Sequence, residues 1–583
     1  MWESGCTEES RHRRSNNVVI VGGGPAGSTA ALCLRKLGRD ATVLERAKFP
    51  RYRIGESLLP GTMAILSRLG VIDKVEAANF TVKRAATFCW GADRPPWSFT
   101  FATPQTAPWV FGHALQVTRG EYDKILLDAA AERGAIVREQ HEVTDFHLPS
   151  ADGPLQVFWK NCAAEGREPA DFLIDASGLR GVVSQKLTVR QWDRYYRNMA
   201  IWSYWKGGRR YKGDLEGNTF SVSFGEGWIW IIPLKGDLYS IGVVTAIENN
   251  QRIREAGAEA FYLSCLQQCS LATDVLGTAT MCDEVHVLRE WSYEAKVLSQ
   301  GPTFFCGDAA CFIDPLFSQG VHLATYSGML AAAAIDYLYD HPEDTQCVHA
   351  WYEQAYRAAY NRYHKFVAAF YALNQEPDSK FWSSRKIEGA QDHRFDGKAW
   401  FSALTGETSE PGADGIDEFQ SSASTLAELW QHGVADVNDS YDASELGARR
   451  VLWAQELMKQ FRRLVAIHWK GDEAHLLPSF RVNTTTFKLE RRHYIGDGKS
   501  RSMRAYGMSE GHRQLFESMI TEPLSFHELI QRLTELKGEG SPIQIVERLF
   551  AEGLLHGCDR AGQQVVVRIP LQFGGVGCHD DLS

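Results

Sequence analysis

The fold is decided by the stretch Val19-Ile20-Val21-Gly22-Gly23-Gly24-Pro25-Ala26-Gly27-Ser28. The β-branched run from Val18 to Val21 predicts a strand, and the apolar spacing of Pro25 to Leu37 predicts a helix that ends at Gly38. A second strand is expected at Ala41 to Leu44. The sequence therefore begins with one unit of strand, helix and strand.

The glycines of this unit fit the pattern G-x-G-x-x-G, which binds dinucleotides where a strand passes into a helix. Gly22 allows the tight turn, Gly24 lets the backbone approach a pyrophosphate, and Gly27 lets helix and strand pack closely. Ala26 lies in the same turn, and Glu45 ends the second strand at the distance expected of the acid that binds ribose hydroxyls. Glycine clusters also occur in plain loops, but strand, helix and acid together predict a Rossmann-like dinucleotide site.

The bulk properties of the chain narrow its class and its partners. A length of 583 residues exceeds one ordinary core, so two or three domains are expected. The net charge of −10 argues against a nucleic-acid partner, because phosphate binding needs clustered basic residues. The sequence has no apolar run long enough to span a membrane, so we expect no membrane contact and a cytoplasmic protein. None of the 12 cysteines has the spacing of a zinc site, so free thiols and no metal are expected.

Composition and patterning predict the domain organisation. We expect a disordered tail at 1–17, a nucleotide-binding domain at 18–375 with a sheet-rich substrate region at about 75–235, and a linker at 376–417. Residues 418–583 are expected to form a mainly helical domain, in which 509–570 has a winged-helix-like pattern. This segment is acidic, which again disfavours DNA. The predicted fold class is α/β, with α+β character overall.

Three further segments resemble the flavoprotein monooxygenase superfamily. Cys306-Gly307-Asp308-Ala309-Ala310 resembles its second FAD signature, in which the aspartate holds the ribityl chain. The segment ending at Arg119 resembles the stretch in which an arginine reaches the cofactor. Asp175-Ala176-Ser177-Gly178 stands where aromatic hydroxylases have an Asp-Gly motif, with Ser177 as a departure from it. The resemblance implies an aromatic-hydroxylase-like architecture with FAD as the cofactor.

The stretch Gly227-Trp228-Ile229-Trp230-Ile231-Ile232-Pro233 matches G-W-x-W-x-I-P, the signature of flavin-dependent halogenases. Trp228 and Trp230 are two positions apart on a strand, so they point to the same face. Packing in the core is the alternative role for such residues. In the family, this pair lines the region between flavin and substrate and disfavours direct oxygenation of the substrate.

Lys83 lies in a segment, Val82 to Gly91, that resembles the halogenase segment in which a lysine precedes a strand ending in Trp-Gly. The resemblance implies that reduced FAD, O₂ and chloride yield hypochlorous acid, which the lysine hydrogen-bonds or carries as a chloramine. A desolvated amine loses its proton more easily than an exposed one. Neighbouring strand residues face opposite ways, so either Lys83 or Arg84 could face inward, and the motif selects Lys83. An exposed lysine is the alternative.

Two more segments match the halogenases. Arg51 to Pro60 corresponds to a segment that passes close to the flavin, and we expect Arg53 and Ser57 to contact the cofactor there. Asp314 to Val321 corresponds to Pro-x-x-Ser-x-Gly, which places Pro315, Gly320 and Val321 near the flavin. The backbone N–H groups of Gln319 and Gly320 suit a chloride ion at a helix entry. A plain helix start capped by Ser318 is the structural alternative.

Phe317 is a departure from the halogenases of free tryptophan, which carry a glutamate at this position. A phenyl ring accepts no proton. We therefore expect a self-activating substrate, such as a phenol, a pyrrole or an enolisable acyl thioester. Ser57 to Met63, Gly307 to Leu323 and the long C-terminal extension look most like a family member that chlorinates an acyl group.

These resemblances imply an FAD-dependent halogenase of natural-product (antibiotic) biosynthesis, acting on a small-molecule or carrier-protein-bound substrate. A separate flavin reductase is expected to supply reduced FAD, since the sequence has no second nucleotide fingerprint. The alternatives are a monooxygenase of the same superfamily and a non-catalytic flavin-binding scaffold. A covalent ester between Glu290 and the flavin is a further hypothesis.

Overall fold

The computed structural model describes residues 17–91, 96–101, 111–150, 153–277, 279–289, 292–372, 374, 379–385, 459–461, 463–470, 476–495, 510–536, 542–551 and 554–565. The chain divides into two compact units. The first comprises residues 1–385 with the short segments 404–411 and 485–488, and the second comprises the remaining residues. Glu290, most of the predicted tail and most of the predicted linker lie outside the described residues.

The first unit is built on a six-stranded sheet with the strand order β20-β21-β11-β1-β2-β7. All neighbours in it are parallel except β20 and β21. Parallel strands need covering helices on their faces, which is why β1 and β2 are almost wholly apolar. The strands are β1 Asn17–Val21, β2 Asp40–Leu44, β7 Ile136–Arg138, β11 Phe172–Asp175, β20 Ser299–Gln300 and β21 Thr303–Phe305.

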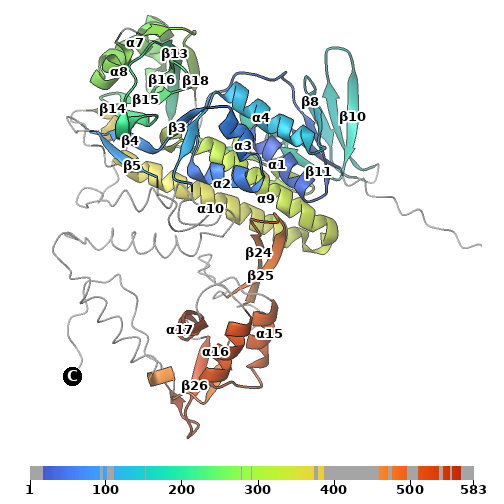
Figure 1. The fold of residues 1–583 in the computed structure, drawn as a ribbon. Coiled ribbons are helices and arrows are strands. Elements are labelled where there is room, and N and C mark those ends of the chain that lie inside the picture. Colours follow the sequence, from blue (N-terminus) through green and yellow to red (C-terminus); the bar gives the residue numbers. More distant parts are fainter. Residues whose placement is uncertain are drawn as a thin grey trace, which may run out of the picture. The chain divides into compact units, whose positions relative to one another are not determined.

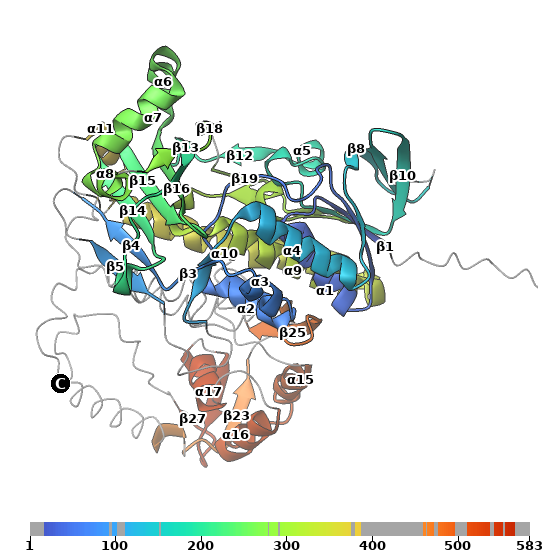
Figure 2. The ribbon, with the colours of Figure 1, turned by 45° about the horizontal axis from the view of Figure 1, so that its top comes forward.

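Helices pack around the first helix of this unit. α1 (Pro25–Lys36) contacts both α4 (Arg119–Glu132) and the long α9 (Gly320–Asp340). α9 runs beside α10 (Thr345–Ala372), as Figures 1 and 2 both show. The remaining helices of this region are α2 Pro60–Arg68, α3 Ile72–Ala77, α5 Ser184–Leu187 and α11 Lys380–Ser383. The predicted strand, helix and strand at the start of the chain agree with β1, α1 and β2 to within one residue at each end.

A second, mainly antiparallel sheet carries the tryptophan signature. Its order is β17-β13-β16-β15-β14-β4-β5, and β18 pairs with β13. α7 packs on β13 and β16, and it lies with α8 at one side of the sheet in Figure 2. The elements are β4 Ala85–Cys89, β5 Trp97–Thr100, β13 Asn198–Lys206, β14 Thr219–Phe224, β15 Gly227–Pro233, β16 Leu238–Ala246, β17 Thr280–Met281, β18 His286–Arg289, α6 Asn250–Ala256, α7 Ala258–Gln267 and α8 Ser270–Leu276.

Smaller sheets complete the first unit. They have the orders β10-β9-β8, β12-β19-β22 and β3-β6. Their strands are β3 Thr81–Lys83, β6 Ala114–Gln116, β8 Glu142–His147, β9 Leu155–Lys160, β10 Glu165–Ala170, β12 Arg190–Trp192, β19 Tyr293–Ala295 and β22 Cys311–Phe312. The sheet-rich stretch expected at about 75–235 is therefore divided among several sheets, and the tryptophan-bearing sheet continues to Arg289. Strand patterns alone do not say which strands pair.

The described part of the linker expected at 376–417 is ordered structure of the first unit. α11 lies there, and its Trp382 is fully buried, with its indole N–H donating to the carbonyl of Phe224 at 2.8 Å. Arg385 is also buried and donates to the Oδ1 of Asn198 at 2.6 Å. The surrounding Ser- and Gly-rich composition hid these two anchors in the sequence.

The second unit has the order of a winged helix. α15 (Glu510–Ser518) is followed by a bridge between Leu524 and Ile467, by α16 (Phe526–Glu535) and α17 (Pro542–Ala551), and by the ribbon of β26 (Leu555–Cys558) and β27 (Gln564–Val565). β23 (Ala466–Trp469) pairs with β26, and β24 (Leu476–Val482) pairs with β25 (Leu489–Ile495). Ser525 and Glu528 form a capping box at the start of α16. The predicted fold class is confirmed.

In the part of the chain that the structure describes, no helix is long and apolar enough to cross a membrane. The same residues contain no group of three or more His, Cys, Asp or Glu that could hold a metal ion. Each described cysteine is a free thiol.

Candidate active site

A cavity of about 480 Å³ opens at the carboxyl ends of β1, β2, β11 and β21. Ligands bind at this edge in open α/β sheets, because the loops that leave the strands converge there. Of the residues predicted to hold the cofactor, those that line the cavity are Gly22, Gly24, Ala26, Glu45, Arg53, Arg119, Asp308, Gly320 and Val321. Segments that are far apart in the sequence therefore meet in one site.

The glycines of the first turn fit their predicted roles. Gly22 has a φ of +104°, and a Cβ at this position would overlap the carbonyl oxygen of Ala176. A Cβ at Gly27 would overlap the carbonyl oxygen of Gly22, so this glycine allows α1 to approach β1. Gly24 precedes α1 and lines the cavity with its backbone exposed to the ligand space. The turn therefore offers backbone N–H groups at a helix start to a negatively charged group.

Glu45 fixes the shape of this turn. Its Oε2 accepts a hydrogen bond from the N–H of Gly23 at 2.8 Å, and its Oε1 accepts from the N–H of Ala47 at 2.8 Å. The side chain is buried at the end of β2 and lines the cavity. Each carboxylate oxygen can accept a second hydrogen bond, so Glu45 can also accept hydrogen bonds from ribose hydroxyl groups.

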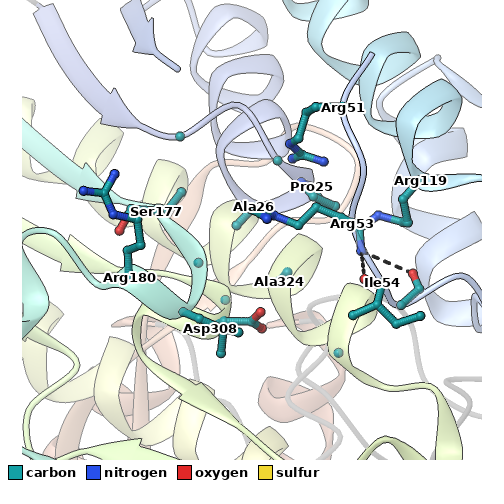
Figure 3. A pocket seen from close by; sticks show the side chains of 18 of the residues that line it. Pro25, Ala26, Arg51, Arg53, Ile54, Arg119, Ser177, Arg180, Asp308 and Ala324 are labelled. Carbon is teal, nitrogen blue, oxygen red and sulfur yellow. Dashed lines mark hydrogen bonds between the residues drawn. The ribbon is translucent and has the colours of Figure 1, made fainter. Parts of the chain in front are cut away.

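Five arginines line the cavity: Arg46, Arg51, Arg53, Arg119 and Arg180. Figure 3 shows Arg51, Arg53 and Arg119 on one side of the cavity and Arg180 on the other. The buried Asp123 accepts from Arg51 at 2.6 Å and from Arg119 at 2.8 and 2.9 Å, which fixes both guanidinium groups. Arg119 also donates to the carbonyl of Ile54 at 2.8 Å. The excess of guanidinium groups suits an anionic ligand such as a pyrophosphate.

Asp308 stands opposite these arginines, in the 3₁₀ turn Gly307–Ala309 (Figure 3). Burial raises the pKa of its carboxyl group to about 6, and the positive charges of Arg119 and Arg53 oppose this shift. Gly320 and Val321 begin α9 at the same end of the cavity. The Gly-rich turn, the arginines and a hydroxyl-accepting aspartate together fit an FAD molecule, which has a pyrophosphate between a ribitol and a ribose, with an aromatic ring system at each end.

The loop predicted to hold chloride is tightly ordered. Pro315 begins a 3₁₀ turn, Ser318 has the left-handed φ of +61°, and α9 starts at Gly320. Ser318 does not cap α9, because Gln319 occupies the N-cap position without a side-chain cap. The Nε2 of Gln319 donates to the carbonyl of Asp314 at 2.6 Å. A left-handed serine followed by open helix N–H groups is the geometry of an anion-binding loop.

Trp228 and Trp230 lie on the same face of β15, as predicted. Ile229 and Ile231 face the opposite way, into the apolar core between this sheet and its covering helices. The two indole rings are 6.2 Å apart, and both side chains are buried. The indole of Trp230 lies over Gly242 of β16, where a Cβ would overlap the ring. The face with the tryptophans is thus distinct from the helix-covered core of the sheet.

A buried hydrogen-bond network joins this tryptophan pair to the loop that was predicted to hold chloride. The hydroxyl of Tyr371, on α10, accepts from the indole N–H of Trp228 at 2.5 Å and donates to the Oδ2 of Asp314 at 2.9 Å. Asn198 also donates to Asp314 Oδ2, at 2.9 Å. Burial raises the pKa of Asp314 to about 6, and the bonds from Asn198 and Tyr371 oppose the shift. Tyr371 was not predicted, because it lies far from both motifs in the sequence.

Replacing Tyr371 with phenylalanine should destabilise the protein by about 1–3 kcal/mol, since the buried N–H of Trp228 loses its acceptor. The rate of chlorination should fall by about tenfold more than the affinity for FAD, because Tyr371 no longer joins Trp228 on β15 to Asp314. Urea denaturation, FAD titration and product analysis measure the three effects. Unchanged chlorination in a destabilised variant would show that the network serves the fold alone.

Lys83 is buried at the end of β3, with an exposed fraction of 1%, whereas its neighbour Arg84 is exposed. The Nζ atom donates to the Oγ of Ser57 at 2.8 Å and to the carbonyl of Leu58 at 3.2 Å. Burial lowers the pKa of this amine to about 7. The inward orientation predicted for Lys83 is therefore the one found, and the alternative of an exposed lysine is wrong.

Some predicted residues lie away from the cavity. Ser57, Pro315, Gln319, Lys83, Trp228 and Trp230 are absent from the cavity lining that the described residues form. Ser57 instead holds Lys83, and its hydroxyl lies 3.0 Å from that of Thr219. The proposed covalent link at Glu290 cannot be placed, since this residue lies outside the described residues.

Three aromatic residues of the cavity were missed in the sequence. The imidazole of His286 stacks between Tyr52, at 5.0 Å, and Trp202, at 5.4 Å. All three line the cavity. Trp202 and His286 are direct neighbours across β13 and β18, so only the strand pairing brings them together. Tyr52 lies within the predicted flavin segment and could have been found there.

Comparison with known proteins identifies the family. Residues 17–113 and 102–398 match the family model described as tryptophan halogenase. The tryptophan 2-halogenase of Chondromyces crocatus is 33% identical over 445 residues, which cover 75% of this chain and 80% of that protein. The chain belongs to the flavin-dependent halogenase family. The sulochrin halogenase of Aspergillus terreus is also 33% identical, over 64% of this chain and 72% of that protein.

Solved structures of halogenases agree with this assignment. CmlS, a flavin-dependent halogenase, matches 97% of this chain and all of its own, with 43% identity and a TM-score of 0.70. The myxobacterial chondrochloren halogenase CndH matches 66% of this chain and 87% of its own, with 38% identity and a TM-score of 0.61. Residues 453–569 match the C-terminal domain of the chloramphenicol halogenase CmlS. The predicted resemblance to the halogenase of chloramphenicol biosynthesis is confirmed.

The protein is therefore an enzyme of this family, with FAD as its cofactor, and chloride is the halide that such enzymes use. Halogenases of this family generally work with a separate flavin reductase and a small-molecule substrate. The family matches confirm the prediction that the chain is a flavin-dependent halogenase.

Proposed function

We propose that this halogenase passes hypochlorous acid to Lys83, which then chlorinates an activated substrate. The observation that carries the proposal is the buried position of Lys83 on a strand next to the flavin segment. Reduced FAD and O₂ supply the oxidising power that converts chloride to hypochlorous acid. The protein's own residues hold the halide, guide the product of this step and exclude water.

The surroundings of Lys83 favour a neutral amine. Its two hydrogen-bond partners are the hydroxyl of Ser57 and the carbonyl of Leu58, neither of which carries a charge that would stabilise an ammonium ion. In a neutral amine, two N–H groups donate these bonds and the lone pair stays free. The lone pair attacks the chlorine of hypochlorous acid, the amine proton leaves with the hydroxide as water, and a chloramine remains. This geometry favours the chloramine over simple hydrogen bonding of hypochlorous acid.

The protonation of Lys83 gives a pH dependence. Because burial lowers the pKa of the amine to about 7, the amine is charged and inactive below this value and neutral above it. Chlorination should therefore rise as the pH is raised from about 6 to 7. The rate of product formation at saturating substrate measures this limb, with the reoxidation of reduced FAD in the same samples as the control. A flat profile across this range would exclude a neutral lysine as the required form.

The chloride site proposed at the N–H groups of Gln319 and Gly320 draws its support from the start of α9. The helix is 21 residues long, and its first N–H groups point away from the helix interior at the edge of the cavity. The amide of Gln319 is held by the carbonyl of Asp314, so the loop is pre-shaped. An anion bound here would lie between the flavin cavity and the tryptophan pair.

The substrate is proposed to be self-activating, such as an acyl group held by a carrier protein or a phenol. Phe317 supports this, since its ring is buried against Phe88, Phe366 and Phe370, with centroids 5.5, 4.4 and 5.1 Å away. Such a wall supplies no proton acceptor for an unactivated arene. The names of the relatives do not decide between substrates, since they include tryptophan, sulochrin and chondrochloren.

The test combines the enzyme with a flavin reductase, NADH, FAD, O₂ and chloride, and offers acyl thioesters on a carrier protein, free phenols and free tryptophan. Mass spectrometry should find the chlorine isotope pattern on the thioester or the phenol. Chlorinated tryptophan as the preferred product would exclude the proposed substrate class. A hydroxylated product without chlorine would exclude the proposed reaction.

A further inference from the structure

Glu56 is a buried carboxyl group for which the proposed reaction has as yet no role. Its exposed fraction is 3%, and it precedes Ser57, which holds Lys83. Glu56 and Ser57 lie in extended chain beside β6, where the N–H of Val117 donates to the carbonyl of Glu56 and Ser57 bridges to Gln116. Neighbouring side chains of extended chain point to opposite sides. The carboxyl group therefore faces away from Lys83, toward the second sheet.

A chain of hydroxyl groups leads from this carboxyl group to the flavin cavity. The hydroxyl of Tyr204, on β13, donates to Glu56 Oε1 at 2.7 Å. It also lies 3.3 Å from the hydroxyl of Tyr52, which accepts from the indole N–H of Trp202 at 2.6 Å. Tyr52 and Trp202 line the cavity, and Tyr52 is 47% exposed. Two hydrogen-bonded hydroxyls thus join a buried acid to the ligand space.

The second carboxyl oxygen of Glu56, Oε2, does not take part in this chain of hydroxyl groups. Oε2 is buried and accepts no well-aligned hydrogen bond from the residues that the structure describes, although the Ser240 hydroxyl is close enough to lower the pKa of this group. A buried ionised carboxylate with one poorly solvated oxygen is costly, which favours the protonated carboxyl group, and its O–H on Oε1 can donate to the Tyr204 oxygen. The structure therefore contains a site for one proton at the end of the hydroxyl chain.

We propose that Glu56 is a proton-transfer residue that serves the flavin cavity through the hydroxyls of Tyr204 and Tyr52. In the protonated state, Glu56 Oε1–H donates to the Tyr204 oxygen and the Tyr204 hydroxyl turns to donate to the Tyr52 oxygen. The carboxyl proton then passes to Tyr204, the Tyr204 proton passes to Tyr52, and the Tyr52 proton enters the cavity. The transfer leaves Tyr204 donating to the ionised carboxylate, which is the bond that the structure shows. No electron moves in this relay, and Glu56 is reprotonated from solvent between turnovers. The proposal rests on the proposed function, because the formation of hypochlorous acid is the step that consumes this proton.

The reaction has such a demand. Reduced FAD, O₂, chloride, one proton and a substrate C–H bond give oxidised FAD, a C–Cl bond and two water molecules. Where bound FAD and substrate displace water from the cavity, a protein group has to supply this proton. Hydrogen-bonded hydroxyl chains carry protons without the movement of heavy atoms.

The charges around Glu56 fit the role. Burial raises the pKa of this carboxyl group to about 7, and the hydroxyls of Tyr204 and Ser240 from the second sheet oppose the shift, as does the more distant positive charge of Arg119 from α4. An acid with this pKa is half-protonated near neutral pH and can both give and regain a proton. The protonated form dominates below about pH 7, so loss of the proton should produce the falling limb of the chlorination profile at higher pH.

The first test compares Glu56→Gln with the natural enzyme. The amide keeps the size and the hydrogen bond to Tyr204 but cannot release a proton. FAD affinity should therefore stay within about twofold, and the midpoint of urea unfolding should not shift. Chlorination should fall about 10²-fold, and the falling limb of the pH profile should disappear while the rising limb of Lys83 remains. Tyr204→Phe should give the same profile, because it interrupts the relay. Tyr262→Phe removes a buried hydroxyl on the other face of the sheet and should leave turnover unchanged.

The second test separates this proposal from the role of Lys83. In a Lys83→Met background, added taurine traps the hypochlorous acid that escapes from the enzyme. The chloride-dependent formation of chlorinated taurine can then be measured without knowing the substrate. If the relay supplies the proton, adding Glu56→Gln should lower the rate at which chlorinated taurine forms by about 10²-fold. An unchanged yield would overturn the relay, and so would full chlorination in Tyr204→Phe beside a loss in Glu56→Gln. If the natural enzyme chlorinates none of the offered substrates but the Lys83→Met variant still chlorinates taurine at its usual rate, the proposed substrate class is contradicted. The relay remains supported in that case.

Discussion

Lys83→Met should abolish chlorination, by about 10³-fold or more, while the variant still binds FAD and reoxidises it. Methionine matches lysine in length and suits the buried position, where the amine has an exposed fraction of 1%. The hydroxyl of Ser57 keeps Thr219 as a partner, so the site should stay ordered. Stopped-flow absorbance follows flavin reoxidation, and mass spectrometry follows the chlorinated product in the same reactions.

The neighbouring residue provides a matched control. Arg84→Met removes a positive charge one position away, but its side chain is exposed on the other side of the strand. This variant should chlorinate at the natural rate. Persistent chlorination in Lys83→Met would show that another group carries the chlorine, and equal losses in both variants would point to a general effect of charge on this strand.

Gly27→Ala should prevent FAD binding and destabilise the apoprotein. The new Cβ would overlap the carbonyl oxygen of Gly22, which is backbone and cannot rotate away, so α1 has to move from β1. Overpacking of this kind costs about 1–3 kcal/mol or more. Urea unfolding of the apoprotein measures the stability, and quenching of flavin fluorescence measures FAD binding.

Gly24→Ala separates ligand contact from protein packing. Its Cβ would meet only the Nη2 of Arg51, at an ordinary 3.4 Å, so the apoprotein should lose no more than about 1 kcal/mol from the poorer N-cap. FAD affinity should still fall at least tenfold, or about 1.4 kcal/mol, because the methyl group occupies the approach to the pyrophosphate. Natural FAD affinity in this variant would mean that the pyrophosphate lies elsewhere.

Local patterns in the sequence predicted the parts of the fold that depend on neighbouring residues. The first strand, helix and strand were placed to within a residue, since their apolar periodicity and glycines act over short distances. The shared face of Trp228 and Trp230 also follows from strand geometry alone. The inward side of the strand at Lys83 needed the family motif in addition, because alternation leaves two choices.

Contacts between distant segments were beyond such patterns. The stacking of His286 on Tyr52 and the hydrogen bond from Trp228 to Tyr371 both join residues more than a hundred positions apart, so they depend on strand pairing and helix packing. The relation of Ser57 to Lys83 was hidden for the same reason, and Ser57 was expected at the cofactor instead. The sequence motifs supplied the candidate residues, while the tertiary structure determines which partners those residues have.

The network around Tyr371 also bears on how the protein is made. Trp228 receives its buried partner from a residue 143 positions later, and Asn198 is held by Arg385, which comes 187 positions later. A growing chain on the ribosome therefore completes the buried contacts of Trp228 and Asn198 only after α10 and α11 have emerged. Nascent chains that stop before Arg385 should expose this sheet and depend on chaperones, since long-range contacts form late and unpaired apolar surfaces aggregate.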